Sequence, residues 1–408
     1  MKKFIPVSLR ERHFRRFMAG YALSLISSTM VPVVVTFALF EDGRGAEAVS
    51  AALAAQFGPN IILMLVGGVV ADKFPRRTVM ACANLLRFFS QALLAGLLFT
   101  HHAPLGAIMA LMACIGVGGA FFAPGLQGLM TELVPEPHLH SANVINSMAI
   151  SIGRVAGPAL GGVLVAVAGG SVAIALDSLV YLVCVVILFS LPALPRPTTP
   201  RDTMLVLLKE GWSAFFGRKW LWVSALQFAM MNLLVIGPLL VLGPLLFAHQ
   251  AHGALGWGGL LSLMGVGTIV GSVLIIRFKP RYPLRLMTMA SVSFALMPGA
   301  LAAHLPYFWV GVCFLIRGMF TPVYMVLFGT LVQTKVPKDK LSRVSAYDYI
   351  ASFGTLPLGY ALAAPLAQIC SLPGALWLGV GVVIVSAVSV LMVKEVWMVQ
   401  AGPEIDQS

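Results

Sequence analysis

The chain has 408 residues, of which 59% are hydrophobic and only 10% are charged, and its mean hydropathy is +0.92. Soluble proteins carry roughly 25% charged residues, so this composition excludes an ordinary soluble enzyme or binding domain and indicates a polytopic membrane protein. The formal net charge of +12 suggests a nucleic-acid partner unless the positions of the basic residues explain it otherwise.

Twelve apolar segments are long enough to cross a bilayer. A helix needs roughly 20 residues to span a hydrocarbon core of about 30 Å, and only a helix satisfies its own backbone polar groups in lipid. The segments lie near 17–39, 48–71, 78–100, 104–130, 141–168, 171–192, 219–248, 254–277, 284–302, 306–334, 342–369 and 373–393. We therefore expect an all-α polytopic membrane protein with twelve transmembrane helices.

The basic residues lie almost entirely in alternate gaps between these segments. If the N-terminus is inside, the gaps that face the cytoplasm hold 23 of the 27 Lys and Arg residues, and the opposite loops hold only Arg44. Positive residues stay on the cytoplasmic side during insertion, so both termini are predicted to be cytoplasmic. Topology accounts for the charge, and we expect no nucleic-acid partner.

The gap between the second and third segments carries a compact charged motif. It reads Gly68-Val-Val-Ala-Asp72-Lys-Phe-Pro-Arg76-Arg77, and Glu132 lies just after the fourth segment, at its cytoplasmic end. An acid and a basic pair at the mouth of two membrane helices could form ion pairs that close only in one conformation. We predict a conformational latch made of Gly68, Asp72, Arg76, Arg77 and Glu132.

The fifth segment carries a run of small residues, Gly153-Arg154-Val-Ala-Gly157-Pro158-Ala-Leu-Gly161-Gly162. Glycines at this spacing make a flat face on which another helix can pack closely. Pro158 lacks a backbone donor and favours a kink.

Five charged residues lie well inside the apolar segments, away from their ends: Arg87, Arg154, Asp177, Arg317 and Asp348. Ionisable groups at membrane depth are costly and by default indicate function. Arg154 and Arg317 either favour an anionic or carbonyl-rich substrate or pair with Asp177 and Asp348. For Arg87 we expect structural pairing or snorkelling.

Several other polar, aromatic and methionine side chains are candidates for a substrate cavity, because such groups make an adaptable site for bulky amphipathic molecules. With Arg317 they are Phe122, Gln127, Gln227, Met231, Asn232 and Tyr324. At any one of these positions core packing is the commoner role. No catalytic constellation is present, and the scattered cysteines and histidines predict neither a disulfide framework nor a metal site.

The two halves of the chain contain a weak sequence repeat. Phe122-Ala-Pro124 and Phe320-Thr-Pro322 begin similar blocks, and residues 193–218 form the longest polar interruption. Parallel six-helix repeats are typical of one class of secondary transporters. We expect bundles at 1–192 and 219–408, joined by a cytoplasmic loop at 193–218.

These motifs together resemble the major facilitator superfamily. The Asp72 motif resembles that family's loop between helices two and three, with Val70, Lys73 and Pro75 departing from the usual pattern. The Gly157-Pro158 run resembles the family's fifth-helix exporter motif, although Val144 replaces its upstream glycine. Phe14 to Gly20 and Asp177-Ser178 resemble the branch of bacterial siderophore exporters and macrolide efflux pumps.

The resemblance implies a transporter of the bacterial inner membrane that works by alternating access, usually as a monomer. It implies export of an amphipathic small molecule such as a siderophore, with a macrolide or multidrug pump as the alternative. An uptake permease and a non-transporting sensor of the same fold stay open as further readings. No phosphate-binding loop for ATP is present, so we expect no cofactor and an ion gradient as the energy source. Protons are the expected ion, with Asp348 and Asp177 as the coupling candidates.

Overall fold

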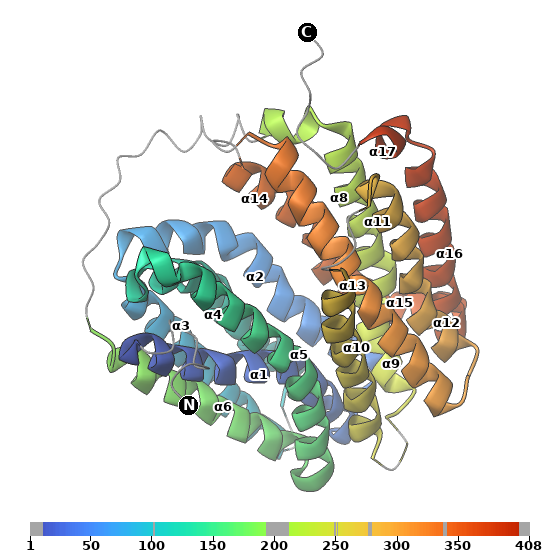
Figure 1. The fold of residues 1–408 in the computed structure, drawn as a ribbon. Helices are drawn as coiled ribbons and strands as arrows, with labels where there is room; N and C mark the ends of the chain where they lie inside the picture. The colour runs from blue at the N-terminus through green and yellow to red at the C-terminus, as the bar shows by residue number, and fades with distance from the viewer. Residues whose placement is uncertain are drawn as a thin grey trace. The chain divides into compact units, whose positions relative to one another are not determined.

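A computed structural model describes residues 11–100, 103–192, 212–248, 250, 252–275, 280–337 and 341–399. Within these ranges a few side chains, including those of Asp72 and Gln127, lie outside the description. All regular structure in the described ranges is helical (Figure 1). The sequence-based prediction of an all-α fold is confirmed.

Two compact units divide the chain, Met1–Pro197 with Pro244–Ser262 and Thr198–Gly243 with Leu263–Ser408. The helices of the first unit are α1 (Arg12–Glu41), α2 (Ala46–Lys73), α3 (Arg76–Phe99), α4 (Leu105–Leu133), the short η3 (Glu136–His138), α5 (Leu139–Ala168) and α6 (Gly170–Phe189). The first ten residues of α10 (Gly253–Ile275) also belong to this unit.

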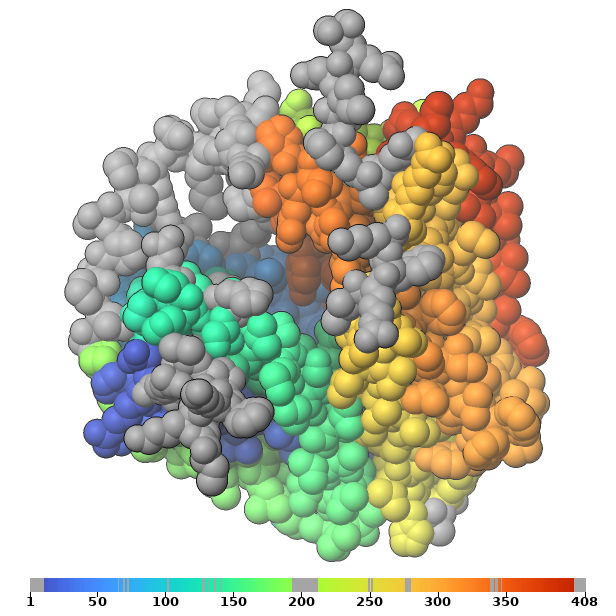
Figure 2. Space-filling view, viewed as in Figure 1, coloured from blue at the N-terminus to red at the C-terminus, as the bar shows by residue number. Residues whose placement is uncertain are grey.

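In the second unit, residues 212–216 are helical. A membrane helix in three parts follows: α8 (Lys219–Met231), the π-helical η4 (Asn232–Ile236) and the start of α9 (Gly237–Leu245). The remaining elements are the rest of α10, α11 (Pro283–Ser291), η5 (Val292–Ala295), α12 (Leu296–Ala302), α13 (Tyr307–Lys335), α14 (Leu341–Phe353), α15 (Leu356–Cys370), α16 (Leu372–Leu391) and α17 (Lys394–Met398). In the space-filling view, side chains fill the spaces between the ribbons of these helices (Figure 2).

Eleven helices in the described ranges are long and apolar enough to cross a membrane. The predicted segment 48–71 forms most of α2, which has 28 residues but is not among those eleven. The chain is a multi-pass membrane protein, and the count of twelve stays a prediction.

One backbone feature repeats in both units. Gly169 joins α5 to α6 with φ 82° and ψ 161°, and Ser371 joins α15 to α16 with φ 64° and ψ 163°. The two residues are 202 positions apart, close to the 198 positions that separate Phe122 from Phe320 at the start of the two sequence blocks. Glycine adopts this region readily, whereas other residues are strained there. The Ser371 hydroxyl accepts a hydrogen bond from the amide of Gly374 at 3.3 Å.

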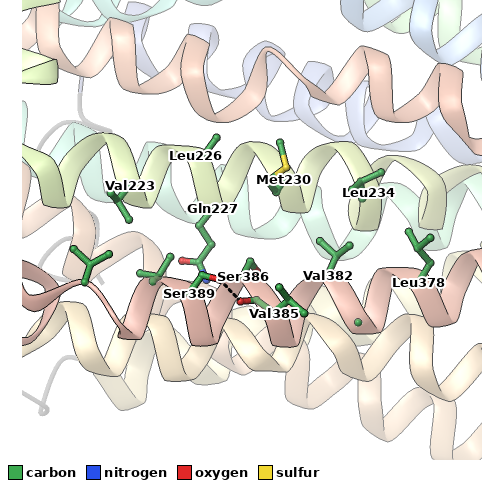
Figure 3. A pocket seen from close by; sticks show the side chains of 13 residues that line it. Val223, Leu226, Gln227, Met230, Leu234, Leu378, Val382, Val385, Ser386 and Ser389 are labelled. Carbon is green, nitrogen blue, oxygen red and sulfur yellow. Dashed lines mark hydrogen bonds between the residues drawn. The ribbon is translucent and has the colours of Figure 1, made fainter.

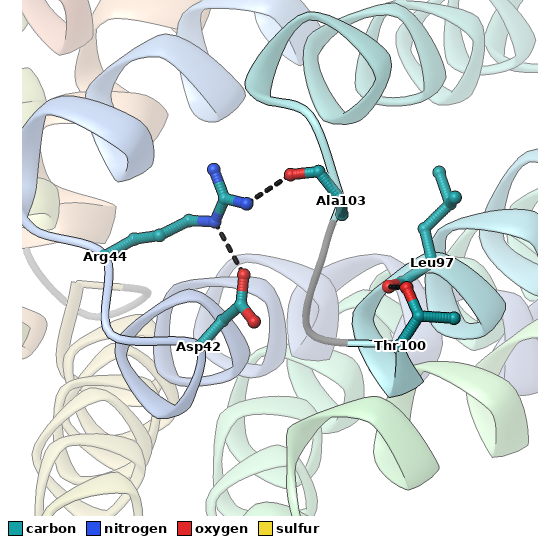
Figure 4. A network of polar contacts seen from close by, with 5 residues as sticks. All are labelled: Asp42, Arg44, Leu97, Thr100 and Ala103. Atoms are coloured by element: carbon teal, nitrogen blue, oxygen red, sulfur yellow. Dashed lines mark hydrogen bonds and ion pairs between the residues drawn. The ribbon is translucent and has the colours of Figure 1, made fainter.

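The loop between α1 and α2 is tied down by polar contacts (Figure 4). Arg44 pairs with Asp42 at 2.7 Å and also donates to the carbonyl of Ala103, just before α4. Nearby, the Glu41 carboxylate accepts a hydrogen bond from the backbone amide of Gly170 at 2.6 Å. A carboxylate at a helix N-terminus is favourable, so this end of the first unit is held together by charge.

Candidate functional site

At the α2–α3 junction, the structure brings together two members of the predicted latch. Arg76 donates to Glu132 at 2.7 Å, with the two side chains 17% and 18% exposed. Arg77 donates to the carbonyl of Leu191. The Asp72 side chain lies outside the described residues, so its part in the latch stays a prediction.

Two neighbouring glycines in this region have different surroundings. A side chain at Gly67 would meet the carbonyl carbon of Ala120 on α4 at 3.0 Å, whereas one at Gly68 would meet nothing within 4 Å. Gly67 therefore lets α2 and α4 pack closely, a role that the motif around Gly68 did not reveal. Among the described residues of the first unit, no packing contact requires a glycine at Gly68.

The small residues of α5 contact two helices of the same unit. Gly153, Gly157 and Gly161 lie against α1, while Pro158 and Gly162 lie against the start of α10. The hydroxyl of Thr29 on α1 donates to the carbonyl of Gly153 at 2.7 Å, and that of Ser262 on α10 donates to the carbonyl of Val155 at 2.7 Å. The run thus allows close packing on both sides, as small residues do in membranes.

A polar stripe on α5 was not foreseen from the sequence. It consists of Asn143, Ser147, Ser151 and Arg154. At 100° per residue these positions span roughly 80° of the helix surface. All four are exposed or half-exposed. Their spacing of four, four and three residues was a visible signal, which the glycine pattern in the same helix obscured.

Four exposed apolar residues of α5 lie on the other side of the helix, roughly 140° to 160° from the centre of the stripe: Ile152, Leu160, Val163 and Val167. Two more, Val144 and Met148, lie closer to it, at roughly 60° and 100°. A guanidinium facing hydrocarbon is costly, so the apolar face suits lipid and the stripe suits water.

Asp177 on α6 lies in a buried polar cluster inside the first unit. Its side chain is 2% exposed, and both carboxylate oxygens lack a hydrogen bond of normal geometry. Ser27 on α1 and Gln91 on α3 lie beside it, and Arg87 on α3 acts on it through its charge.

The guanidinium of Arg87 lies 5.5 Å from the ring centre of Phe122 and 5.3 Å from that of Tyr181. A side chain at Gly119 would approach Arg87 to 2.8 Å. The cluster therefore depends on a glycine of α4 as well as on the charged pair. Phe122, a cavity candidate, is 7% exposed and contributes to this cluster.

In the second unit the buried charges have other partners. Arg317 is 6% exposed, lies 3.4 Å from the ring centre of Phe294 and donates to Thr321 at 2.8 Å. Asp348 is half-buried and accepts a hydrogen bond from Ser352 at 3.5 Å. Among the described residues neither forms a salt bridge.

Three of the cavity candidates lie in the core of the second unit. Met231 is 0% exposed, Asn232 1% and Tyr324 6%. The Asn232 amide donates to the carbonyls of Phe228 at 3.1 Å and Ser352 at 2.9 Å. Tyr324 stacks on Phe228 with ring centres 4.3 Å apart. Each side chain thus has a packing role, while the Gln127 side chain lies outside the description.

Gln227, the remaining candidate, lines a groove of about 780 Å³ between α8 and α16 (Figure 3). The α8 side contributes Val223, Leu226, Met230 and Leu234, and the α16 side includes Leu378, Gly381, Val382, Val385, Ser386 and Ser389. Small-molecule sites have roughly this volume and such an apolar lining with few polar groups.

A model of the Major Facilitator Superfamily matches residues 17–354. The chain belongs to this superfamily and is a transporter rather than an enzyme.

Two similar proteins are named for export. Macrolide efflux protein A of Streptococcus pyogenes is 24% identical over 362 residues, 87% of this chain and 89% of that protein. Enterobactin exporter EntS of Escherichia coli O1:K1 / APEC is 24% identical over 352 residues, 84% and 82% of the two chains. The predicted resemblance to this branch is confirmed.

Solved structures share the fold at low sequence identity. The nucleoside transporter NupG has a TM-score of 0.77 at 12% identity, covering 95% of this chain and 100% of that one. A D-xylose-proton symporter has a TM-score of 0.70 at 16% identity, covering 95% and 97%. These likenesses bear on the fold alone.

Proposed function

We propose that the protein is a proton-driven exporter that moves an amphipathic small molecule, in the first place a siderophore, out of a bacterial cell by alternating access. The observation that carries this proposal is the α5 stripe with its exposed Arg154. A cation held on a polar face at membrane depth suits an anionic cargo. Export is supported by the names of the two relatives and by the glycine and proline contacts of α5.

The siderophore proposal is tested with a deletion strain grown in low iron. Siderophore should build up inside the cells and fall in the medium, and the wild-type gene should reverse both changes. A gene copy with Arg154→Gln should not reverse the two changes. A copy with Arg317→Gln should largely reverse them, because Arg317 is buried against Phe294. Normal secretion by the deletion strain would contradict the siderophore proposal.

A macrolide or multidrug pump is the second candidate. It is favoured by the groove between α8 and α16, because no charged residue lines it. The same deletion strain should then become more sensitive to macrolides while secreting siderophore normally.

For proton coupling we propose Asp177 first and Asp348 second. Asp177 has no salt bridge among the described residues and is almost fully buried, and such carboxylates form proton relays in transporters. In proteoliposomes, Asp177→Asn should abolish transport driven by a pH gradient while preserving exchange of cargo at equal pH. If Asp177→Asn retains gradient-driven transport and Asp348→Asn loses it, the order is reversed.

For the latch we propose that Asp72 joins Arg76, Arg77 and Glu132 when one side of the transporter is closed. Asp72→Asn should stall transport without removing the protein from the membrane. Gly68→Ala makes a matched test with Gly67→Ala, because only the second meets backbone in this structure. Loss of transport in a well-folded Gly68→Ala protein would show that Gly68 packs closely in another conformation.

We also propose the remaining features of the topology. The protein lies in the inner membrane as a monomer with both termini in the cytoplasm. Its six-helix halves are residues 1–192 and 219–408, and residues 193–218 form a cytoplasmic loop. The distribution of Lys and Arg supports this orientation.

A further inference from the structure

The groove between α8 and α16 contains the side-chain amide of Gln227, and the hydrogen bond that this amide lacks indicates what kind of ligand would fit. Gln227 is 3% exposed, and its Oε1 has no hydrogen-bond partner. Its side chain reaches from α8 toward α16 at the level of Ser386 and Ser389 (Figure 3). The rest of the lining is almost entirely aliphatic, so a buried acceptor remains unsatisfied in an apolar groove.

The surrounding hydrogen bonds fix the orientation of the Gln227 amide. The hydroxyl of Ser291 donates to the carbonyl of Thr288 at 2.6 Å, so its only hydrogen is used. Ser291 can therefore only accept from Gln227, and the amide nitrogen, 3.1 Å away, must be the atom that faces it. The free atom is thus the carbonyl oxygen, which requires a donor.

The depth of Gln227 decides which occupants can supply that donor. Gln227 lies eight residues after Lys219, about 12 Å along a spanning helix of about 40 Å. That position is inside the hydrocarbon region, where phospholipid acyl chains carry no N–H or O–H group. A lipid tail would fill the groove but leave the acceptor unpaired, which is costly in an apolar setting.

The hydroxyls of the two groove serines add acceptors but no donors. Ser386 donates to the carbonyl of Val383 at 3.1 Å, and Ser389 donates to that of Val385 at 2.8 Å. Their hydrogens are used within α16, while their lone pairs remain. The polar groups of the groove, Gln227, Ser386 and Ser389, can thus accept hydrogen bonds and carry no charge.

We infer that the groove between α8 and α16 binds a neutral, mainly apolar molecule that donates a hydrogen bond from a hydroxyl or amide group to Gln227. The groove is separate from the Arg154 stripe, and its ligand is uncharged. That this ligand is also a transported cargo rests on the proposed function. Binding can be measured without transport, so the two proposals fail independently.

The test uses a matched pair of fluorescent probes, 1-pyrenebutanol and its methyl ether, which differ in the hydrogen-bond donor. Binding is measured to the full-length protein in phosphatidylcholine nanodiscs, with empty nanodiscs as the partitioning control. Wild-type protein should bind the alcohol about tenfold more tightly than the ether, the usual scale of one buried hydrogen bond. Gln227→Met should remove this preference by weakening the alcohol alone.

A second variant tests whether the groove is the site. A side chain at Gly381 would meet nothing within 4 Å, so Gly381→Leu should narrow the groove without disturbing the fold and should weaken binding of both probes. Gly96→Leu, an equally open glycine on α3, is the control and should leave binding unchanged. Equal binding of alcohol and ether to wild-type protein would assign the groove to lipid tails and overturn the inference. Undiminished binding to the Gly381→Leu protein would also overturn it.

Discussion

In the first unit a half-buried arginine and a buried carboxylate act on each other through their charges, whereas in the second unit the arginine and the carboxylate have separate partners. Arg87 and Asp177 share one cluster, and Arg87 also lies between two aromatic rings. Arg317 instead lies on one ring and bonds one hydroxyl, and Asp348 bonds only Ser352 among the described residues.

The two repeats therefore offset the free-energy cost of charged side chains at membrane depth in different ways. A buried pair is interdependent, because removal of one member leaves the other uncompensated. A cation compensated by a ring and a hydroxyl leaves no orphaned charge when it is removed. The same residue types at membrane depth should therefore respond differently to substitution in the two units.

The largest expected effect is that of Arg87→Leu. It removes the attraction between Arg87 and Asp177 together with the contacts of Arg87 with two aromatic rings, and we expect the free energy of unfolding to fall by about 3 kcal/mol. Unfolding in SDS–detergent micelles, followed by tryptophan fluorescence, measures this change. The double variant Arg87→Leu with Asp177→Leu should recover most of the loss, and a simple sum of the two single effects would disprove the pairing.

A smaller effect is expected at the junctions that repeat in the two units. Gly169→Ser should lower the free energy of unfolding by about 2 kcal/mol, because serine is strained at this φ and ψ. The reverse change, Ser371→Gly, should stabilise the protein by about 1 kcal/mol despite losing the hydroxyl bond to Gly374. Opposite signs in the same unfolding assay are the expected result, and equal signs would argue against a shared junction.

The smallest expected effect is that of Arg317→Leu. It removes an interaction with the Phe294 ring, which is worth about 1 kcal/mol, and leaves no carboxylate unpaired. The midpoint of SDS unfolding should shift less than in the Arg87→Leu protein. A shift as large as that of Arg87→Leu would show that Arg317 compensates a charge after all.

Much of the fold could be predicted because a membrane helix requires a long apolar stretch of sequence. Apolar length gave the predicted segments, and the spacing of glycines in α5 indicated the close contacts that α5 makes with α1 and α10. The approach of Arg76 to Glu132 followed from opposite charges at neighbouring helix ends.

The parts that were missed depend on which faces of separate helices meet. The cluster of Arg87, Asp177, Ser27 and Gln91 joins three helices. No sequence pattern within one helix predicts how that helix is rotated about its own axis relative to the other two. The groove at Gln227 likewise results from two helices distant in sequence, α8 and α16. Core packing of Met231 and Tyr324 was foreseen as the commoner role for such residues.

The π-helical turn η4 sets the angular position of Gln227. A π turn accommodates one more residue than the α-helix around it, so deletion of one residue within 232–236 would rewind the segment as continuous α-helix. Because the five π-helical residues turn through about the same angle as four α-helical ones, Gln227 would still face α16 after the deletion. Rewinding the segment as α-helix without a deletion would instead rotate α8 by roughly 100° relative to Gly237, which lies against Gly359. The π turn thus accommodates a single extra residue while keeping the polar end of α8 in phase with its neighbours.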